Sequence, residues 1–305
     1  MRINPILEKE LKVKMRGWKS PILITIYLFV LCMIIFVALW GIESRSDFGP
    51  QAALNTYYVI VTLQFVLLSM ITPALTATAI SGERERQTLD LLLCTEASAF
   101  SIIWGKLTAS ITHVILLIIV SLPILGTIFM FGGINLLDFF VVFIYYIVLC
   151  FFLASLGLFF STIFKKNLTS IIFTYAVTLF LYFGSYIILI FTPLLSYVFG
   201  TNAFEVDALF ICLITSLILC NPIAGFGFVI NPDIADIFYG SNISFLNFMH
   251  PWVYSCLSCI LYVVLTYILI RISTYKINPL KVGIVELREI KKIEKNLKNE
   301  GIKKH

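Results

Sequence analysis

A short charged stretch between two long apolar runs constrains the fold of this chain more than any other feature. Residues 83–86 read Glu-Arg-Glu-Arg, and the flanking apolar runs extend over about residues 54–80 and 102–131. A charged side chain at the centre of a bilayer costs about 2.5–3.5 kcal/mol even on the most lenient scale. The four charges are therefore expected outside the membrane, and the two apolar runs are expected to cross it.

The composition of the whole chain supports this interpretation. Of the 305 residues, 60% are hydrophobic and 13% are charged, and the mean hydropathy is +0.98. A soluble domain carries about 25% charged residues. The apolar runs have the length of helices and not of the ~10-residue alternating strands of a barrel. The sequence therefore predicts an all-α membrane protein.

Six apolar runs approach or exceed the ~20 residues that a helix needs to cross a bilayer. They lie at about residues 21–41, 54–80, 102–131, 139–164, 168–192 and 252–270, within a predicted six-span domain over residues 21–272. Pro73 lies in the second predicted span and is expected to kink it or to end its regular part. Between the last two spans, an irregular outer region over about residues 193–250 is predicted to form re-entrant or interfacial helices.

The positions of the Lys and Arg residues predict how the spans are oriented. With six spans, 21 of the 22 Lys and Arg residues fall on one side of the membrane, and only Arg45 falls on the other. The positive-inside rule makes the basic side cytoplasmic. The chain is therefore expected to be a multi-pass protein of the cell membrane, with both termini and the stretch at 83–86 in the cytoplasm.

Both ends of the chain are basic. Residues 1–20 are predicted to form an amphipathic elbow helix in the membrane interface, the alternative being a solvated charged N-terminus. Its apolar positions recur at helical spacing: Leu7, Leu11, Met15 and Trp18. Residues 273–305 form a lysine-rich tail. The tail is predicted to be either a short helix along the inner leaflet or a partner protein, or a frayed segment attracted to anionic lipid.

The residues from the charged stretch onward have the pattern of a short amphipathic helix. Acidic side chains at its start complement the helix dipole, and Leu89, Leu92 and Leu93 fall on one face. A helix over about residues 82–95 is therefore predicted between the second and third spans. Its leucine face is expected to be covered by a partner or, alternatively, by its own bundle or the lipid interface.

Residues 73–92, followed by Gly-Lys-Leu at 105–107, resemble the signature of ABC-2 type transporter permeases. In that family a proline-containing second helix leads to a Glu-x-Glu segment, a Thr-Leu-x-x-Leu helix and a Gly-Lys-Leu that opens the third helix. The six spans, the elbow helix and the irregular outer region fit the same family. The chain departs from it at Thr95-Glu96, where many members carry a Pro-Leu or Pro-Ile step.

The resemblance implies a permease subunit of an ATP-binding cassette transporter, and more specifically of an exporter. The helix at 82–95 would be a coupling helix that docks on a separate ATPase subunit, which binds and hydrolyses ATP, so that this chain binds no cofactor. A second permease copy, identical or paralogous, and membrane lipid are the other implied partners, and no nucleic acid is expected. The residues expected to contact the ATPase are Glu83, Arg84, Glu85, Arg86, Thr88, Leu89 and Leu92.

The chain is not expected to be an enzyme. A P-loop requires Gly-x-x-x-x-Gly-Lys-Ser/Thr, whereas the only Gly-Lys pair is followed by Leu107. No metal site is predicted. His113 lies within the third predicted span and is a candidate pathway residue, because ionisable groups inside membranes are often functional; structural packing is the alternative. Two other functions stay open: an intramembrane enzyme acting on lipid or peptide, with His113 or Asp233, and a non-transporting subunit of a sensor complex.

Overall fold

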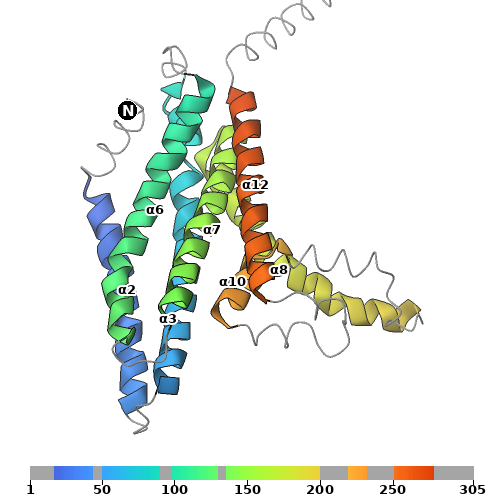
Figure 1. Ribbon diagram of the computed structural model, residues 1–305. Coiled ribbons are helices and arrows are strands. Elements are labelled where there is room, and N and C mark those ends of the chain that lie inside the picture. Colours follow the sequence, from blue (N-terminus) through green and yellow to red (C-terminus); the bar gives the residue numbers. More distant parts are fainter. Residues whose placement is uncertain are drawn as a thin grey trace, which may run out of the picture.

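The computed structural model describes residues 17–43, 50–89, 98–129, 135–199, 219–231 and 251–277. Every regular element within these ranges is a helix (Figure 1), which confirms the predicted all-α class. The helices are α2 (Lys19–Glu43), α3 (Pro50–Thr76), α4 (Ser81–Glu85), α6 (Ala99–Phe129), α7 (Leu136–Ile163), α8 (Asn167–Phe199), α10 (Pro222–Ile230) and α12 (Pro251–Ile277).

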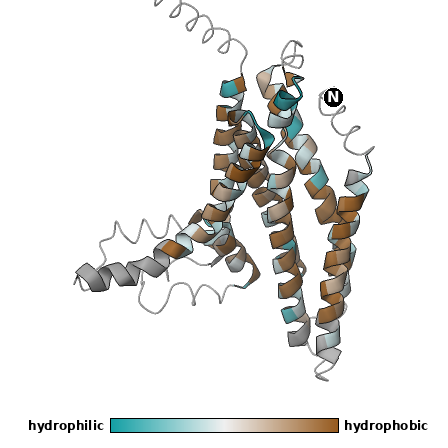
Figure 2. Ribbon diagram, turned by 180° about the vertical axis from the view of Figure 1, so that it is seen from behind, coloured by the Kyte–Doolittle hydropathy of each residue, from teal (hydrophilic) through white to brown (hydrophobic). Residues whose placement is uncertain are grey.

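Six stretches of the described chain are long and apolar enough to cross a membrane, as predicted. They are Ser20–Val37, Ala53–Glu85, Ala99–Thr127, Leu136–Ile163, Asn167–Ile187 and Trp252–Ile277. Successive spans run in opposite directions, so α4 lies at the same end of the bundle as the start of α6 and the end of α12 (Figure 1). We call this end the α4 end. Figure 2 shows mostly hydrophobic helix shafts, with hydrophilic residues gathered near the α4 end.

Helices α8 and α12 continue beyond the ends that the sequence predicted for their spans. Helix α8 continues beyond the expected end near Thr192, through Pro193, to Phe199. A proline removes one backbone donor, a loss that helices in membrane proteins tolerate. Over its last turns α8 leans away from the other helices (Figure 1). Helix α12 likewise continues past Ile270 to Ile277.

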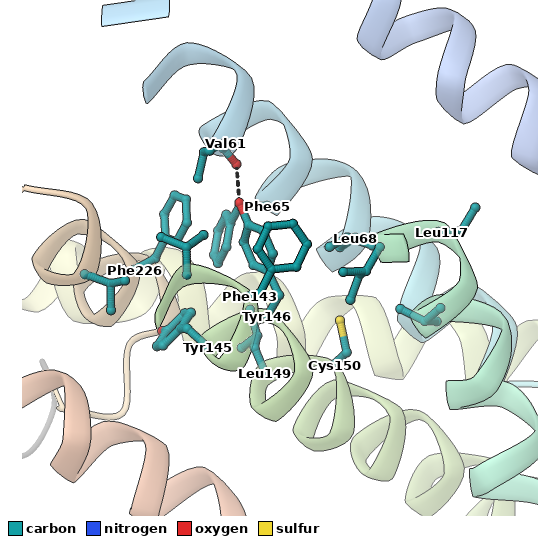
Figure 3. Packing of buried hydrophobic residues seen from close by; sticks show 14 of the residues in the cluster. Val61, Phe65, Leu68, Leu117, Phe143, Tyr145, Tyr146, Leu149, Cys150 and Phe226 are labelled. Atoms are coloured by element: carbon teal, nitrogen blue, oxygen red, sulfur yellow. Dashed lines mark hydrogen bonds between the residues drawn. The ribbon is translucent and has the colours of Figure 1, made fainter. Parts of the chain in front are cut away.

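Helix α7 lies at the centre of the bundle and carries more buried apolar residues than any other described helix. Its buried face packs against α3, α6, α8, α10 and α12. Figure 3 shows Phe65 of α3 and Phe226 of α10 against Tyr146 of α7; the rings of Phe65 and Phe226 stack with centroids 4.2 Å apart. The Tyr146 hydroxyl donates a hydrogen bond of 2.6 Å to the carbonyl oxygen of Val61, which satisfies a polar group that would otherwise be buried unpaired.

Within the predicted irregular outer region, the structure describes helix α10, which packs against α7, α8 and α12. Its N-cap residue, Asn221, is 1% exposed and accepts hydrogen bonds from the backbone N–H groups of Ile223 and Ala224. The Asn221 side-chain amide donates to the carbonyl of Tyr182 and to the hydroxyl of Ser185, both in α8. At nine residues, α10 is too short to cross a bilayer. Residues 200–218 and 232–250 of the predicted outer region lie outside the described residues.

Candidate functional site at helix α4

Helix α3 does not run directly into α4. It ends at Thr76, one turn after Pro73 as expected, and residues 77–80 form a turn that we call the α3–α4 joint. Ala77 and Ile80 in this joint are fully buried, so their backbone polar groups need partners inside the protein.

Hydroxyl groups from neighbouring helices supply those partners. The Ser161 hydroxyl oxygen of α7 accepts hydrogen bonds of 2.8 Å from the backbone N–H groups of both Ile80 and Ser81. The Ser170 hydroxyl of α8 donates to the carbonyl oxygen of Ala77 at 2.6 Å. The interrupted helix is therefore completed by side chains of α7 and α8.

The first charge of the stretch, Glu83, binds a lysine of α6. The Lys106 Nζ atom lies 2.6 Å from Glu83 Oε1, and the Lys106 side chain is only 4% exposed. A charged group this deeply buried needs an ionic partner, because burial removes its hydration. The glutamate therefore neutralises a cation near the start of the third span.

The second charge, Arg84, reaches the end of α7. Its guanidinium group donates hydrogen bonds to the carbonyl oxygens of Thr162 and Phe164, at 3.3 to 3.5 Å. The last carbonyl groups of a helix have no partners within the helix and carry its partial negative charge. Arg84 therefore satisfies the C-terminus of the fourth span.

The third charge, Glu85, reaches the start of α8. Its two carboxylate oxygens accept hydrogen bonds from the backbone N–H of Asn167 at 2.8 Å and from the Asn167 side-chain amide at 2.6 Å. Asn167 also accepts a hydrogen bond of 2.6 Å from the Ser81 hydroxyl. A carboxylate at the N-terminus of a helix complements the helix dipole. Three successive charges thus contact three successive spans.

The structure corrects the predicted single helix over 82–95. Helix α4 ends at Glu85, and Gln87 has a left-handed backbone with φ 56°. The N–H of Thr88 bonds the Glu83 carbonyl, and the N–H of Gln87 bonds the Arg84 carbonyl. This pair of bonds is the Schellman motif, which terminates a helix. The sequence did not indicate it, because glycine usually occupies the left-handed position.

The described residues among the predicted ATPase contacts fall into three groups in the structure. Arg86 and Thr88 are exposed, together with Gln87 between them. Glu83 and Arg84 are partly buried and bind other helices, and Glu85 is exposed but binds Asn167 of α8. Leu89 is 6% exposed and packs with apolar residues of the chain itself, in a cluster that includes Ile103, Leu107, Leu158 and Ile277. The bundle therefore covers Leu89, as in one of the two alternatives for the leucine face.

The remaining predicted site residues lie apart from α4 or outside the described residues. Trp18 is 84% exposed next to the start of α2. His113 of α6 is mostly buried, and its ring nitrogens lie 3.3 and 3.4 Å from the Ser20 hydroxyl of α2. The residues that fall outside the described part of the chain are Leu7, Leu11, Met15, Leu92 and Asp233. The described residues contain no group of three or more His, Cys, Asp or Glu side chains that could hold a metal ion.

Three contributors to the site were missed by sequence reasoning. Ser161, Asn167 and Ser170 lie about 80 residues or more from the residues that they bind. Asn167 had a weak local signal, because it precedes a predicted span as a helix-starting residue would. The two serines had none, since serine inside an apolar span commonly bonds its own helix.

The family model described as ABC-2 family transporter protein matches residues 4–272 of the chain. Among curated proteins, none matches. The matched stretch contains the first five spans, the α3–α4 joint, α4 and most of the sixth span. By this match, the chain belongs to the ABC-2 family of transporter proteins.

Proposed function

We propose that the chain is the membrane subunit of an exporter, driven by a separate ATPase subunit that docks at the α4 end. Family membership makes it a permease of an ABC transporter. The direction of transport and the site of coupling are parts of the proposal. The observation that supports the coupling site is the set of contacts through which α4 binds α6, α7 and α8 at once.

The charge distribution supports a cytoplasmic position for the α4 end. Lys106, Arg271 and Lys276 lie in the parts of α6 and α12 near this end, and Lys165 and Lys166 lie in the turn between α7 and α8. An excess of Lys and Arg marks the cytoplasmic side of membrane proteins. ATP is available on that side, so an ATPase subunit could reach α4 there.

The exposed turn at residues 86–88 is the surface that we propose to contact the ATPase. All three of its residues are exposed, and it carries the charge of Arg86 and the hydroxyl of Thr88. An exposed charge of this kind selects and orients a partner more than it adds affinity. The turn would then be held in place by its neighbours Glu83, Arg84, Glu85 and Leu89. Leu92, in the segment that follows, is proposed to contact the ATPase as well.

Site-specific photo-cross-linking tests the docking surface. A photoreactive amino acid replaces Arg86 or Thr88 in the full chain, and cross-linked products from membranes are identified by mass spectrometry. We expect both positions to capture a protein with a P-loop, and we expect no capture from Leu179, which is 43% exposed on the shaft of α8. Equal capture from Leu179 and from the turn would contradict the proposed surface.

Reconstitution tests whether the captured ATPase is coupled to this permease. We expect wild-type permease in nanodiscs to bind the ATPase and to change its rate of ATP hydrolysis. The substitution Arg86→Glu should weaken binding about tenfold, because it reverses the charge at the proposed contact, while Lys165→Gln serves as the control. A wild-type permease that neither binds the ATPase nor alters its rate would disprove the coupling.

A second permease copy is also part of the proposal. ABC transporters combine two membrane halves, and this chain supplies one six-span half. Native mass spectrometry of the purified complex should give the mass of two permease chains of 34.6 kDa, or of this chain with a paralogue. A complex that contains a single permease chain would contradict this arrangement.

A further inference from the structure

We propose that Lys106 and Asn167 are positioning residues, which hold α4 against α6 and α8 so that a displacement of the turn at 86–88 moves the ends of three spans together. The inference rests on the proposed function in one respect, the assignment of this turn to the ATPase. The positioning itself is a property of the chain alone, so it can be tested without a partner.

Helix α4 cannot hold its own position. It has five residues, far fewer than a helix needs for independent stability in water. The α3–α4 joint separates it from helix α3, which precedes it. Its orientation therefore depends on side-chain contacts with other helices.

Lys106 makes the most buried of these contacts. Its Nζ atom and Glu83 Oε1 are 2.6 Å apart, and the lysine side chain is 4% exposed, whereas that of Glu83 is 24% exposed. The other glutamate oxygen, Oε2, is buried without a hydrogen-bond partner. Replacing Lys106 by glutamine would remove the cation beside the partly buried Glu83 carboxylate, which favours an arrangement in which α4 moves away from α6.

Asn167 makes the contact that involves the most groups. Its backbone N–H and side-chain amide both donate to Glu85, and its side-chain oxygen accepts from the Ser81 hydroxyl. It therefore holds both ends of α4 from one position at the start of α8. The bonds from Arg84 to the carbonyls of α7 are longer, at 3.3 to 3.5 Å, and add a weaker third contact.

These contacts give α4 three points of attachment in addition to the covalent chain. A displacement of the turn at 86–88 would be transmitted to α6 through Glu83, to α7 through Arg84 and to α8 through Glu85. The exposed residues Arg86 and Thr88 would make the contact with the partner, and the charges before them would transmit its movement. The Glu-Arg-Glu-Arg stretch is thus divided between two roles.

Limited proteolysis of the full chain in nanodiscs, without any ATPase, tests the positioning. Trypsin cleaves after exposed Arg86, and the rate is followed by mass spectrometry of the fragments. We expect cleavage to accelerate about tenfold in Lys106→Gln and in Asn167→Ala, because α4 is released. We expect no acceleration in Lys165→Gln, which removes an exposed lysine at the same end, and a near wild-type rate in Lys106→Arg, which keeps the charge.

A double substitution distinguishes a direct contact from general loosening. If Lys106 acts through Glu83, the variant Glu83→Gln/Lys106→Gln should be cleaved no faster than the faster of the two single variants. The proposal would be overturned if the double variant multiplied the accelerations of the two single variants. It would also be overturned if Glu83→Gln and Lys106→Gln were both cleaved at the wild-type rate. If Lys106→Gln fails to fold, Asn167→Ala and Lys106→Arg still test the proposal. Accelerated cleavage after Arg86 in Lys106→Arg would contradict the charge-based contact.

A second measurement adds the partner and separates this inference from the proposed function. In the wild type with bound ATPase, ATP should change the rate of tryptic cleavage at Lys165–Lys166, next to Asn167. The Lys106→Gln variant should bind the ATPase within about threefold of wild type but lose this ATP-dependent change. Wild type that binds no ATPase contradicts the proposed function alone, whereas a variant that responds to ATP like wild type contradicts the transmission.

Discussion

Gly157 determines how closely α3 and α7 approach each other. A Cβ atom at this position would lie 2.1 Å from the Thr76 side-chain oxygen and 3.2 Å from the backbone nitrogen of Ala77. The two atoms belong to the last residue of α3 and to the first residue of the joint. A side chain at position 157 would therefore push α7 away from the end of α3. The Ser161 hydroxyl of α7, which binds the backbone N–H groups of Ile80 and Ser81, would move with it.

The substitution Gly157→Ala is expected to destabilise the protein by about 1–3 kcal/mol, the usual cost of overpacking a close contact. The measurement is the midpoint of thermal unfolding in detergent micelles. Gly126→Ala is the matched control, because nothing lies within 4 Å of a Cβ atom at this second helical glycine. The control should be neutral or slightly stabilised, since alanine favours helices by up to about 1 kcal/mol. Equal destabilisation by both substitutions would contradict the close approach.

Gln87 holds a backbone conformation that favours glycine. Its φ of 56° costs a residue with a side chain roughly 1–2 kcal/mol. The substitution Gln87→Gly is therefore expected to slow amide hydrogen exchange at Thr88, whose N–H bonds the Glu83 carbonyl. Gln87→Val, with a branched Cβ, is expected to accelerate that exchange. Hydrogen exchange measured by mass spectrometry gives the comparison, and the reverse order would contradict the helix-ending turn.

At the scale of an element, α10 shows how a helix too short to cross the membrane is held inside the bundle. Its N-cap, Asn221, joins it to α8, and the Tyr145 hydroxyl of α7 donates to the Pro222 carbonyl at 2.8 Å. At Gly225 a Cβ atom would lie 2.7 Å from the hydroxyl oxygen of Tyr145. The helix thus depends on contacts with longer helices and not on its own length.

The substitution Asn221→Ala should destabilise α10 more than Asn221→Ser does. Serine retains an oxygen that can cap the helix, but it is too short to reach Tyr182 and Ser185 as asparagine does. Loss of a cap alone costs about 0.5–2 kcal/mol. Thermal unfolding should therefore rank wild type above Asn221→Ser and Asn221→Ser above Asn221→Ala. Equal midpoints for the two variants would show that the cap contributes nothing measurable.

At the scale of the whole molecule, the charges and the direction of the spans predict which side of the membrane each end faces. Asn135 and Lys166 are both exposed and lie next to opposite ends of α7. We expect a membrane-impermeant maleimide to label Asn135→Cys in intact cells and Lys166→Cys only after permeabilisation. The experiment uses a background without the native cysteines. Labelling of Lys166→Cys in intact cells would reverse the proposed orientation.

Much of the bundle could be predicted from the sequence because spanning a membrane depends on local properties. The length of an apolar run and the cost of burying a charge are both read directly from consecutive residues. The extension of α8 through Pro193 was not predicted, since the local rule treats proline as a break. The charged stretch follows α3 and precedes α6, as predicted, but the contacts that its residues make were not predicted.

The sequence alone therefore determined six spans, the position of the charged stretch outside the apolar runs and the gathering of basic residues on one side. Only the tertiary structure decided what the charges do. It paired Glu83 with Lys106 and Glu85 with Asn167, ended the helix at Gln87 and buried Leu89 in the bundle. The physical reason is that these contacts join residues on different helices, and the identity of a neighbour across a helix interface depends on how the helices pack.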